Sequence, residues 1–112
     1  MTEKEHNGLK IQDKIGLDKF NQKDYEGAII AFDRVIELDP NNADAYAARG
    51  AAKGWLKDYK GAIADCDKAI AINPDCATAY HTQAVAKQKL GDNEGALADL
   101  HEARNINTKS TP

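Results

Sequence analysis

The strongest constraint on the fold is a motif that recurs three times along the chain at one fixed spacing. Residues 25–40 read YEGAIIAFDRVIELDP, and residues 59–74 read YKGAIADCDKAIAINP. These two segments are identical at seven of 16 positions without a gap. Residues 93–108, NEGALADLHEARNINT, share seven of 16 positions with residues 59–74. A fixed period of about 34 residues is typical of stacked repeat units, in which each unit buries its apolar face against its neighbours.

Each unit is predicted to contain two helices. In the second unit we expect a first helix over residues 43–56, capped by Asn41 or Asn42. A second helix over residues 59–71 is expected to end before Pro74, because proline disfavours helical geometry in the residue that precedes it. Gly50 and Ala62 are predicted to lie where these two helices cross, and a larger side chain there would force the helix axes apart.

These motifs resemble the tetratricopeptide repeat (TPR), a helix–turn–helix unit of about 34 residues. The matching residues are Ile15, Gly16, Ala28, Phe32 and Pro40 in the first unit, Tyr46, Gly50, Ala62, Ala69 and Pro74 in the second, and Tyr80, Ala84, Ala96, Leu100 and Ala103 in the third. The resemblance implies an all-α, right-handed superhelical solenoid of three repeats and six helices, without a C-terminal capping helix. We place the repeats at residues 9–42, 43–76 and 77–110, after a flexible leader over residues 1–8 and before a tail over residues 111–112.

Composition argues against several classes of function. The 15 Lys and Arg residues are outnumbered by 18 Asp and Glu residues, which disfavours a nucleic-acid partner because phosphate contacts need cations. No apolar run is long enough to span a membrane, and the first residues lack the apolar core of a secretory signal. We therefore expect a cytoplasmic protein without a membrane partner, whose Cys66 and Cys76 are reduced thiols.

Catalysis is not expected either. The sequence contains no glycine-rich phosphate loop, no nucleophile motif and no His/Cys set at metal-ligand spacing, so we predict no enzymatic activity, no metal and no cofactor. Asp65, Cys66 and Asp67 are adjacent, but residues two apart do not share a helix face. We expect a buried Cys66 and two solvated aspartates. The lysines at equivalent positions of the three units are expected to extend their ammonium groups into water: Lys19, Lys53 and Lys87.

The resemblance also implies a concave groove that binds a peptide and is lined by the first helix of each repeat. The positions that carry over are Lys10, Asp13, Leu17, Phe20 and Asn21, then Asp44, Ala47, Ala51, Gly54 and Trp55, then Thr78, His81, Val85, Gln88 and Lys89. Leu17, Phe20, Trp55 and Val85 would form an apolar strip, which favours a protein or peptide partner with apolar side chains. Alternatively, Trp55 and Phe20 belong partly to the core.

One subfamily of these repeats clamps the C-terminal carboxylate of chaperone tails with Lys, Asn, Asn, Lys and Arg. The corresponding positions here are occupied by Asp13, Leu17, Ala48, Thr78 and Thr82. None of them matches, and Asp13 would repel a carboxylate, so we predict that chaperone tails are not the ligand.

The rival interpretation is a structural scaffold that associates with itself through its terminal helices. Leu97, Leu100 and Ile106 are predicted to be exposed on the last helix, where they would favour a homodimer or a larger oligomer.

Overall fold

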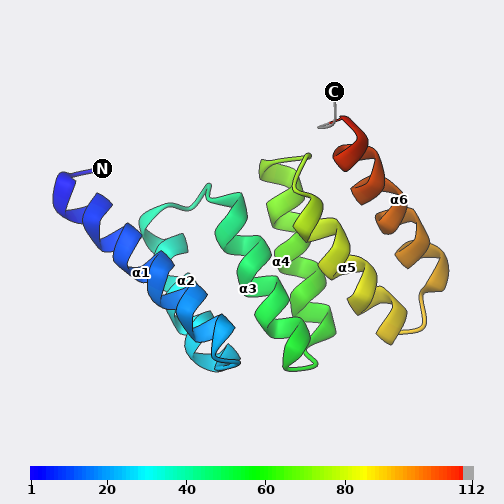
Figure 1. The fold of residues 1–112 in the computed structure, drawn as a ribbon, viewed down its shortest axis with the longest axis horizontal. Helices are drawn as coiled ribbons and strands as arrows, with labels where there is room; N and C mark the ends of the chain where they lie inside the picture. Colours follow the sequence, from blue (N-terminus) through cyan, green and yellow to red (C-terminus); the bar gives the residue numbers. More distant parts are fainter. Residues whose placement is uncertain (110–112) are drawn as a thin grey trace.

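The computed structural model describes residues 1–109, and these residues form six α-helices (Figure 1). Their bounds are α1 (Glu3–Asn21), α2 (Tyr25–Leu38), α3 (Ala43–Trp55), α4 (Tyr59–Ile72), α5 (Ala77–Lys89) and α6 (Asn93–Lys109). The helices follow one another from one end of the molecule to the other, in the order of the sequence. The all-α solenoid that the resemblance implies is confirmed. The predicted tail over residues 111–112 lies outside the described residues.

Neighbouring helices pack as the repeat predicts. Within each repeat the two helices contact each other: α1 with α2, α3 with α4, and α5 with α6. The second helix of one repeat then packs on the first helix of the next, as α2 does on α3 and α4 does on α5. The first helices α3 and α5 also touch directly. The first helices of the second and third repeats therefore lie side by side.

The N-terminal end differs from the prediction, because α1 begins at Glu3 rather than at Leu9. The expected leader over residues 1–8 therefore supplies the first turns of this helix. The Thr2 hydroxyl accepts a hydrogen bond from the Glu5 backbone N–H, while the Glu5 carboxylate accepts one from the Thr2 backbone N–H. This reciprocal capping box satisfies backbone N–H groups that would otherwise lack partners. Hydrogen bonds from Thr2 also lower the pKa of the Glu5 carboxyl.

The turn inside each repeat has the same construction three times. One residue adopts a left-handed conformation, with φ of 64° at Lys23, 68° at Lys57 and 89° at Gly91. The aspartate that follows it accepts a hydrogen bond from the backbone N–H of a glycine in the first turn of the next helix. These pairs are Asp24 with Gly27, Asp58 with Gly61, and Asp92 with Gly95. The aspartate thereby starts the second helix and fixes the direction of the hairpin.

Small side chains allow the two helices of the second repeat to approach closely. Ala62 is fully buried, and a Cβ atom added to Gly50 would lie 3.1 Å from the Ala62 carbonyl oxygen and 3.1 Å from the Cys66 Sγ atom. A larger residue at either position would push α3 away from α4. The predicted crossing point is confirmed.

Candidate functional site

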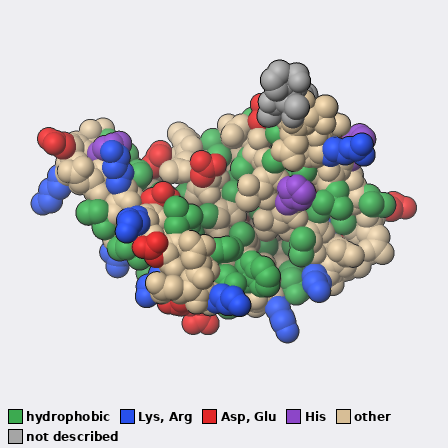
Figure 2. Space-filling model, in the orientation of Figure 1, with side chains coloured by type: hydrophobic (Ala, Val, Ile, Leu, Met, Phe, Trp, Pro, Cys, Tyr) green, Lys and Arg blue, Asp and Glu red, His purple; other side chains and the backbone are tan. Residues whose placement is uncertain are grey.

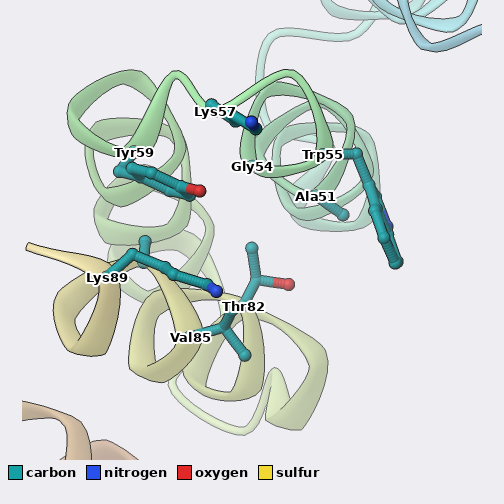
Figure 3. A pocket seen from close by; sticks show the side chains of 9 residues that line it. Ala51, Gly54, Trp55, Lys57, Tyr59, Thr82, Val85 and Lys89 are labelled. Carbon is teal, nitrogen blue, oxygen red and sulfur yellow. The ribbon is translucent and has the colours of Figure 1, made fainter.

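A pocket of about 340 Å³ opens between α3 and α5 (Figure 3). We call it the central pocket. Its lining residues are Ala51, Gly54, Trp55, Lys57, Tyr59, Thr82, Val85, Ala86 and Lys89. Figure 3 shows Tyr59 and Lys89 on one side of it and Ala51 and Trp55 on the other. Most of this lining is apolar, and its only charged side chains are the two lysines, Lys57 and Lys89.

Trp55 stands at the edge of the central pocket and is 65% exposed. Its indole ring stacks on the ring of Tyr25, with 5.6 Å between ring centroids and 6° between ring planes. Tyr25 in turn meets Phe20 edge to face, at 5.3 Å and 76°. We call Phe20, Tyr25 and Trp55 the aromatic trio. Trp55 is thus held in one orientation by the first repeat while much of its surface stays open to solvent.

Five of the residues that the resemblance assigned to the peptide groove line this pocket together: Ala51, Gly54, Trp55, Val85 and Lys89. The predicted groove did not include Tyr59, which begins α4, or Lys57, which lies in the α3–α4 turn. It also lacked Thr82 and Ala86 of α5. A signal for Tyr59 was available, since it occupies in the second repeat the position that Tyr25 occupies in the first. Its contribution to this face depends on the turn that positions it, which a list of first-helix residues does not include.

The other predicted groove residues are more dispersed. Leu17 is 48% exposed, whereas Phe20 is half-buried and packs against the core of the first repeat. The prediction that Ala47 lines the groove is wrong, because its side chain is only 2% exposed and belongs to the core between the second and third repeats. Asp13 is half-buried. The remaining members are exposed: Lys10, Asn21, Asp44, Thr78, His81 and Gln88.

Hydrophobic side chains gather on the face that carries the central pocket. Figure 2 shows them over the C-terminal half of α3 and toward α5, with Lys and Arg side chains along the adjacent lower edge. Val85, on α5, is 54% exposed within this face. An exposed apolar area of this kind, bordered by charge, is typical of a surface that contacts another molecule.

The last helix exposes part of the surface that sequence analysis assigned to self-association. Leu97 is 67% exposed and Leu100 is 42% exposed, and both line a shallow cavity of about 280 Å³ between α5 and α6. The prediction that Ile106 is exposed is wrong, because its side chain is only 9% exposed. The helical repeat turns Ile106 toward α5, on the same side as the buried Ala103.

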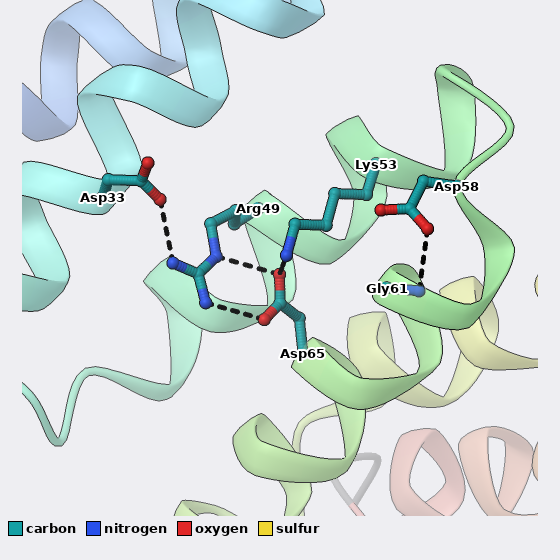
Figure 4. A network of polar contacts seen from close by, with 6 residues as sticks. All are labelled: Asp33, Arg49, Lys53, Asp58, Gly61 and Asp65. Carbon is teal, nitrogen blue, oxygen red and sulfur yellow. Dashed lines mark hydrogen bonds and ion pairs between the residues drawn. The ribbon is translucent and has the colours of Figure 1, made fainter.

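A cluster of charges joins α3 and α4 of the second repeat to α2 of the first (Figure 4). The prediction that Asp65 is solvated is wrong, because its side chain is only 6% exposed. Its carboxylate accepts hydrogen bonds from Arg49 Nε at 2.9 Å and Nη2 at 2.8 Å, and it forms an ion pair with Lys53 at 3.1 Å. Arg49 Nη1 donates to Asp33 on α2 at 2.8 Å. Hydrogen bonding to Asp65 raises the pKa of the Arg49 guanidinium, so this group stays charged.

The same contacts recur one repeat later with different chemistry. Gln83, which occupies in the third repeat the position of Arg49 in the second, is buried and donates from Nε2 to the Asp67 carboxylate. Lys87 Nζ pairs with the buried Asp99 at 2.9 Å, as Lys53 pairs with Asp65. The expectation that these two ammonium groups reach only into water is therefore wrong. The aliphatic stems cross the helix pair, and each ammonium neutralises a buried carboxylate.

The cysteines form no reactive site in the described residues. Cys66 is fully buried and Cys76 is 6% exposed, and both thiols are free. Burial raises the pKa of the Cys66 thiol to about 12, and the neighbouring Asp65 carboxylate adds to this effect. A thiol with so high a pKa is a poor nucleophile at neutral pH.

Residues 1–109 lack the features of a metal site and of a membrane span. No three His, Cys, Asp or Glu side chains there are grouped in a way that could hold a metal ion. No described helix combines the length and apolar character needed to cross a membrane.

Comparison with known proteins agrees with the repeat architecture. Family models described as "TPR repeat" and "Tetratricopeptide repeat" match residues 16–54 and 43–76. No curated protein sequence matches the chain.

Several solved structures are similar. The TPR2B domain of yeast Sti1, solved in a pHsp70 complex, is 30% identical, with a TM-score of 0.88 over 91% of this chain and 82% of that one. The Arabidopsis OM64 TPR domain is 25% identical, with a TM-score of 0.88 over 91% and 84%. The first TPR of Spaghetti (RPAP3), bound to the HSP90 peptide SRMEEVD, is 26% identical, with a TM-score of 0.85 over 89% and 79%. The repeat period, the helix pairs and these similarities together show that the chain belongs to the tetratricopeptide repeat family.

Proposed function

We propose that this chain is a non-catalytic module that binds a segment of another polypeptide on the face formed by α1, α3 and α5. The observation that carries the proposal is the central pocket, where the exposed side chains of Trp55 and Val85 flank an apolar cavity. A concave apolar site with a few polar groups at its rim is the usual form of a ligand site. A peptide bound there would bury apolar surface that the chain alone leaves in water.

Similar proteins support this kind of partner. The Sti1 domain was solved in a pHsp70 complex, and the RPAP3 domain was solved with the HSP90 peptide SRMEEVD. Both have the arrangement of helices seen here. The arrangement is therefore suited to holding a peptide or a protein segment.

The preferred ligand is proposed to differ from the chaperone tails of those neighbours. The five clamp positions carry none of the clamp residues, and Asp13 places a negative charge where a terminal carboxylate would lie. Because the central pocket is mostly apolar, we expect the partner to be held chiefly by apolar side chains.

Selection from a random peptide display library tests the proposal. The purified chain should enrich peptides that bind at least about tenfold more weakly to a Val85→Glu variant. The matched control is Ile30→Glu, which places the same charge at a similarly exposed isoleucine on α2. Enriched peptides that bind both variants alike, or a library that yields no enriched peptide, would contradict the proposal.

A second candidate function is self-association as a scaffold. It rests on the exposure of Leu97 and Leu100, which line an apolar cavity on the last helix pair. In the second repeat, the residue equivalent to Leu100 is Cys66, which is fully buried beneath neighbouring helices. A second copy of the chain docked on α6 would bury Leu100 in the same way.

Light scattering at increasing protein concentration separates the two functions. A scaffold should dissociate when Leu100 is replaced by Glu. It should be unaffected by Trp55→Ala, because Trp55 lines the central pocket and not the cavity beside Leu100. A monomer at all concentrations would eliminate the scaffold and leave the peptide-binding proposal unchanged.

A further inference from the structure

The two junctions between repeats are built from equivalent positions but filled differently. Between the first and second repeats, the aromatic trio occupies the space beside α3. The equivalent positions one repeat later hold Gly54 in place of Phe20, Tyr59 in place of Tyr25, and Lys89 in place of Trp55. All three later residues line the central pocket. The second junction thus keeps the tyrosine and lacks the two aromatic side chains that pack on it in the first junction.

This substitution explains why a cavity exists at the second junction. In the first junction the Trp55 ring lies parallel to the Tyr25 ring. At the second junction the corresponding partner of Tyr59 is the long, exposed side chain of Lys89, which leaves the space beside the ring open. Gly54 contributes no side chain, and a Cβ atom added there would meet only Ala62 Cβ at 3.9 Å. The position has room for more atoms than the chain supplies.

We infer that the central pocket binds an aromatic side chain of the partner peptide, which stacks on Tyr59 as Trp55 stacks on Tyr25. The proposed occupant completes at the second junction an arrangement that the chain itself builds at the first. This inference rests on the proposed function, because it names the ligand chemistry of the same site. Offset or parallel stacking adds to the apolar burial that any large side chain would provide.

The rim of the central pocket specifies the residues beside that aromatic ring. Lys57 and Lys89 are the only charged residues in its lining, and neither forms an ion pair with an acidic side chain among the pairs found in the described residues. Figure 3 shows them approaching the cavity from the α3–α4 turn and from the end of α5. A carboxylate next to the aromatic side chain would complement both lysines. The ligand is therefore an acidic segment that carries a tryptophan, tyrosine or phenylalanine.

Three capped pentapeptides test this inference by fluorescence anisotropy of an attached dye. One has tryptophan between two pairs of glutamates, the second has leucine in its place, and the third has tryptophan between two pairs of lysines. The chain should bind the first at least about tenfold more tightly than either of the others. Added salt should weaken binding of the first peptide, because the rim lysines are exposed.

Two variants fill the cavity with the side chains of the first junction. Lys89→Trp supplies the equivalent of Trp55, and Gly54→Phe supplies the equivalent of Phe20. Each should lower the affinity for the tryptophan peptide by at least about tenfold while thermal unfolding shows a folded protein. The matched control is Ile30→Trp on α2. It adds a tryptophan at an exposed position that does not line the central pocket, and it should leave the affinity unchanged.

The outcomes separate this inference from the proposed function. Equal affinity for the tryptophan and leucine peptides, lost for both in Val85→Glu, would overturn the aromatic ligand and leave peptide binding in place. Full affinity for the tryptophan peptide in both cavity-filling variants would also overturn the aromatic ligand. Binding that Val85→Glu does not affect would overturn both proposals.

Discussion

Arg49 on α3 donates two hydrogen bonds to Asp65 on α4, from Nε to Oδ2 at 2.9 Å and from Nη2 to Oδ1 at 2.8 Å. The third guanidinium nitrogen, Nη1, reaches Asp33 on α2 at 2.8 Å. One side chain therefore joins the two helices of the second repeat to the last helix of the first. This contact fixes how the first two repeats stack behind the proposed binding face.

Replacing Arg49 alone should destabilise the protein. Arg49→Ile would leave Asp65, which is 6% exposed, with Lys53 as its remaining partner. Because Arg49 itself is partly exposed, we expect a loss of about 2–4 kcal/mol in the free energy of unfolding rather than the largest values known for buried pairs. Urea unfolding measures it.

The first repeat provides the control for this prediction, since it has Ile15 and Ala31 at the same two positions. The double variant Arg49→Ile with Asp65→Ala should regain most of the lost stability, because no unpaired buried carboxylate remains. If the double variant loses as much free energy of unfolding as the two single variants do together, the unpaired Asp65 carboxylate is not the cause of the instability.

Ala62→Leu should also destabilise, for a different reason. Ala62 is fully buried where α4 crosses α3, and a Cβ atom added at Gly50 would lie only 3.1 Å from the Ala62 carbonyl oxygen, closer than ordinary van der Waals contact. Extra methyl groups in such a site cost about 1–3 kcal/mol. The control is Ala64→Leu on the same helix, where the side chain is exposed and stability should change by less than about 0.5 kcal/mol. Thermal melts that show no loss for Ala62→Leu would refute the close crossing.

The folded protein should lose stability in alkaline solution through Cys66. Burial raises the pKa of its thiol to about 12, whereas the unfolded thiol ionises near its ordinary value of 9.0. Below pH 9 the thiol is protonated in both states, so its contribution is fully present. Between these two values the unfolded chain releases a proton that the folded chain keeps, so the free energy of unfolding falls as pH rises.

Urea unfolding at several pH values, with Cys66→Ala as the reference, measures this effect. Other groups that titrate in alkali are common to both proteins and cancel in the difference. The variant should be less stable near neutral pH because a small cavity replaces the Sγ atom, and its stability should depend less on pH above about 9. Parallel pH profiles for the two proteins would exclude Cys66 as the cause.

Chaperone-tail binding should be gained only by redesign. The unchanged chain should not bind the peptide SRMEEVD that is seen on the RPAP3 domain. A variant that carries the clamp residues Lys, Asn, Asn, Lys and Arg should bind it, and the positions to change are Asp13, Leu17, Ala48, Thr78 and Thr82. Calorimetric titration of both proteins with this peptide makes the comparison. Tight binding to the unchanged chain would show that the groove recognises carboxylate tails by other residues.

The fold could be predicted because the repeat period and the small residues at helix crossings can be recognised from residue types and their spacing alone. Gly50 and Ala62 mark the approach of α3 to α4 before any contact is known. The start of α1 could not be placed by comparison between repeats, since Thr2 and Glu5 precede the repeated segment. Their capping box was still readable from the residue types alone.

The candidate site was only partly predictable. First-helix register predicted that Trp55 and Val85 share a face, and both line the central pocket, but it also included Ala47, which is buried against the next repeat. The burial of Asp65 could not be recognised, because it depends on Arg49 and Lys53 from another helix. Contacts that join different helices depend on packing angles, which a helical period alone does not specify.

A peptide should bind the face formed by the first helices, and chemical-shift mapping reveals where on the chain it binds. The backbone amides of the isotope-labelled chain are followed by NMR while a display-selected peptide is added. The account predicts that the largest shifts occur at Gly54, Tyr59 and Val85, around the central pocket. Shifts confined to α2, or to α6 around Leu97 and Leu100, with none around the central pocket, would contradict it.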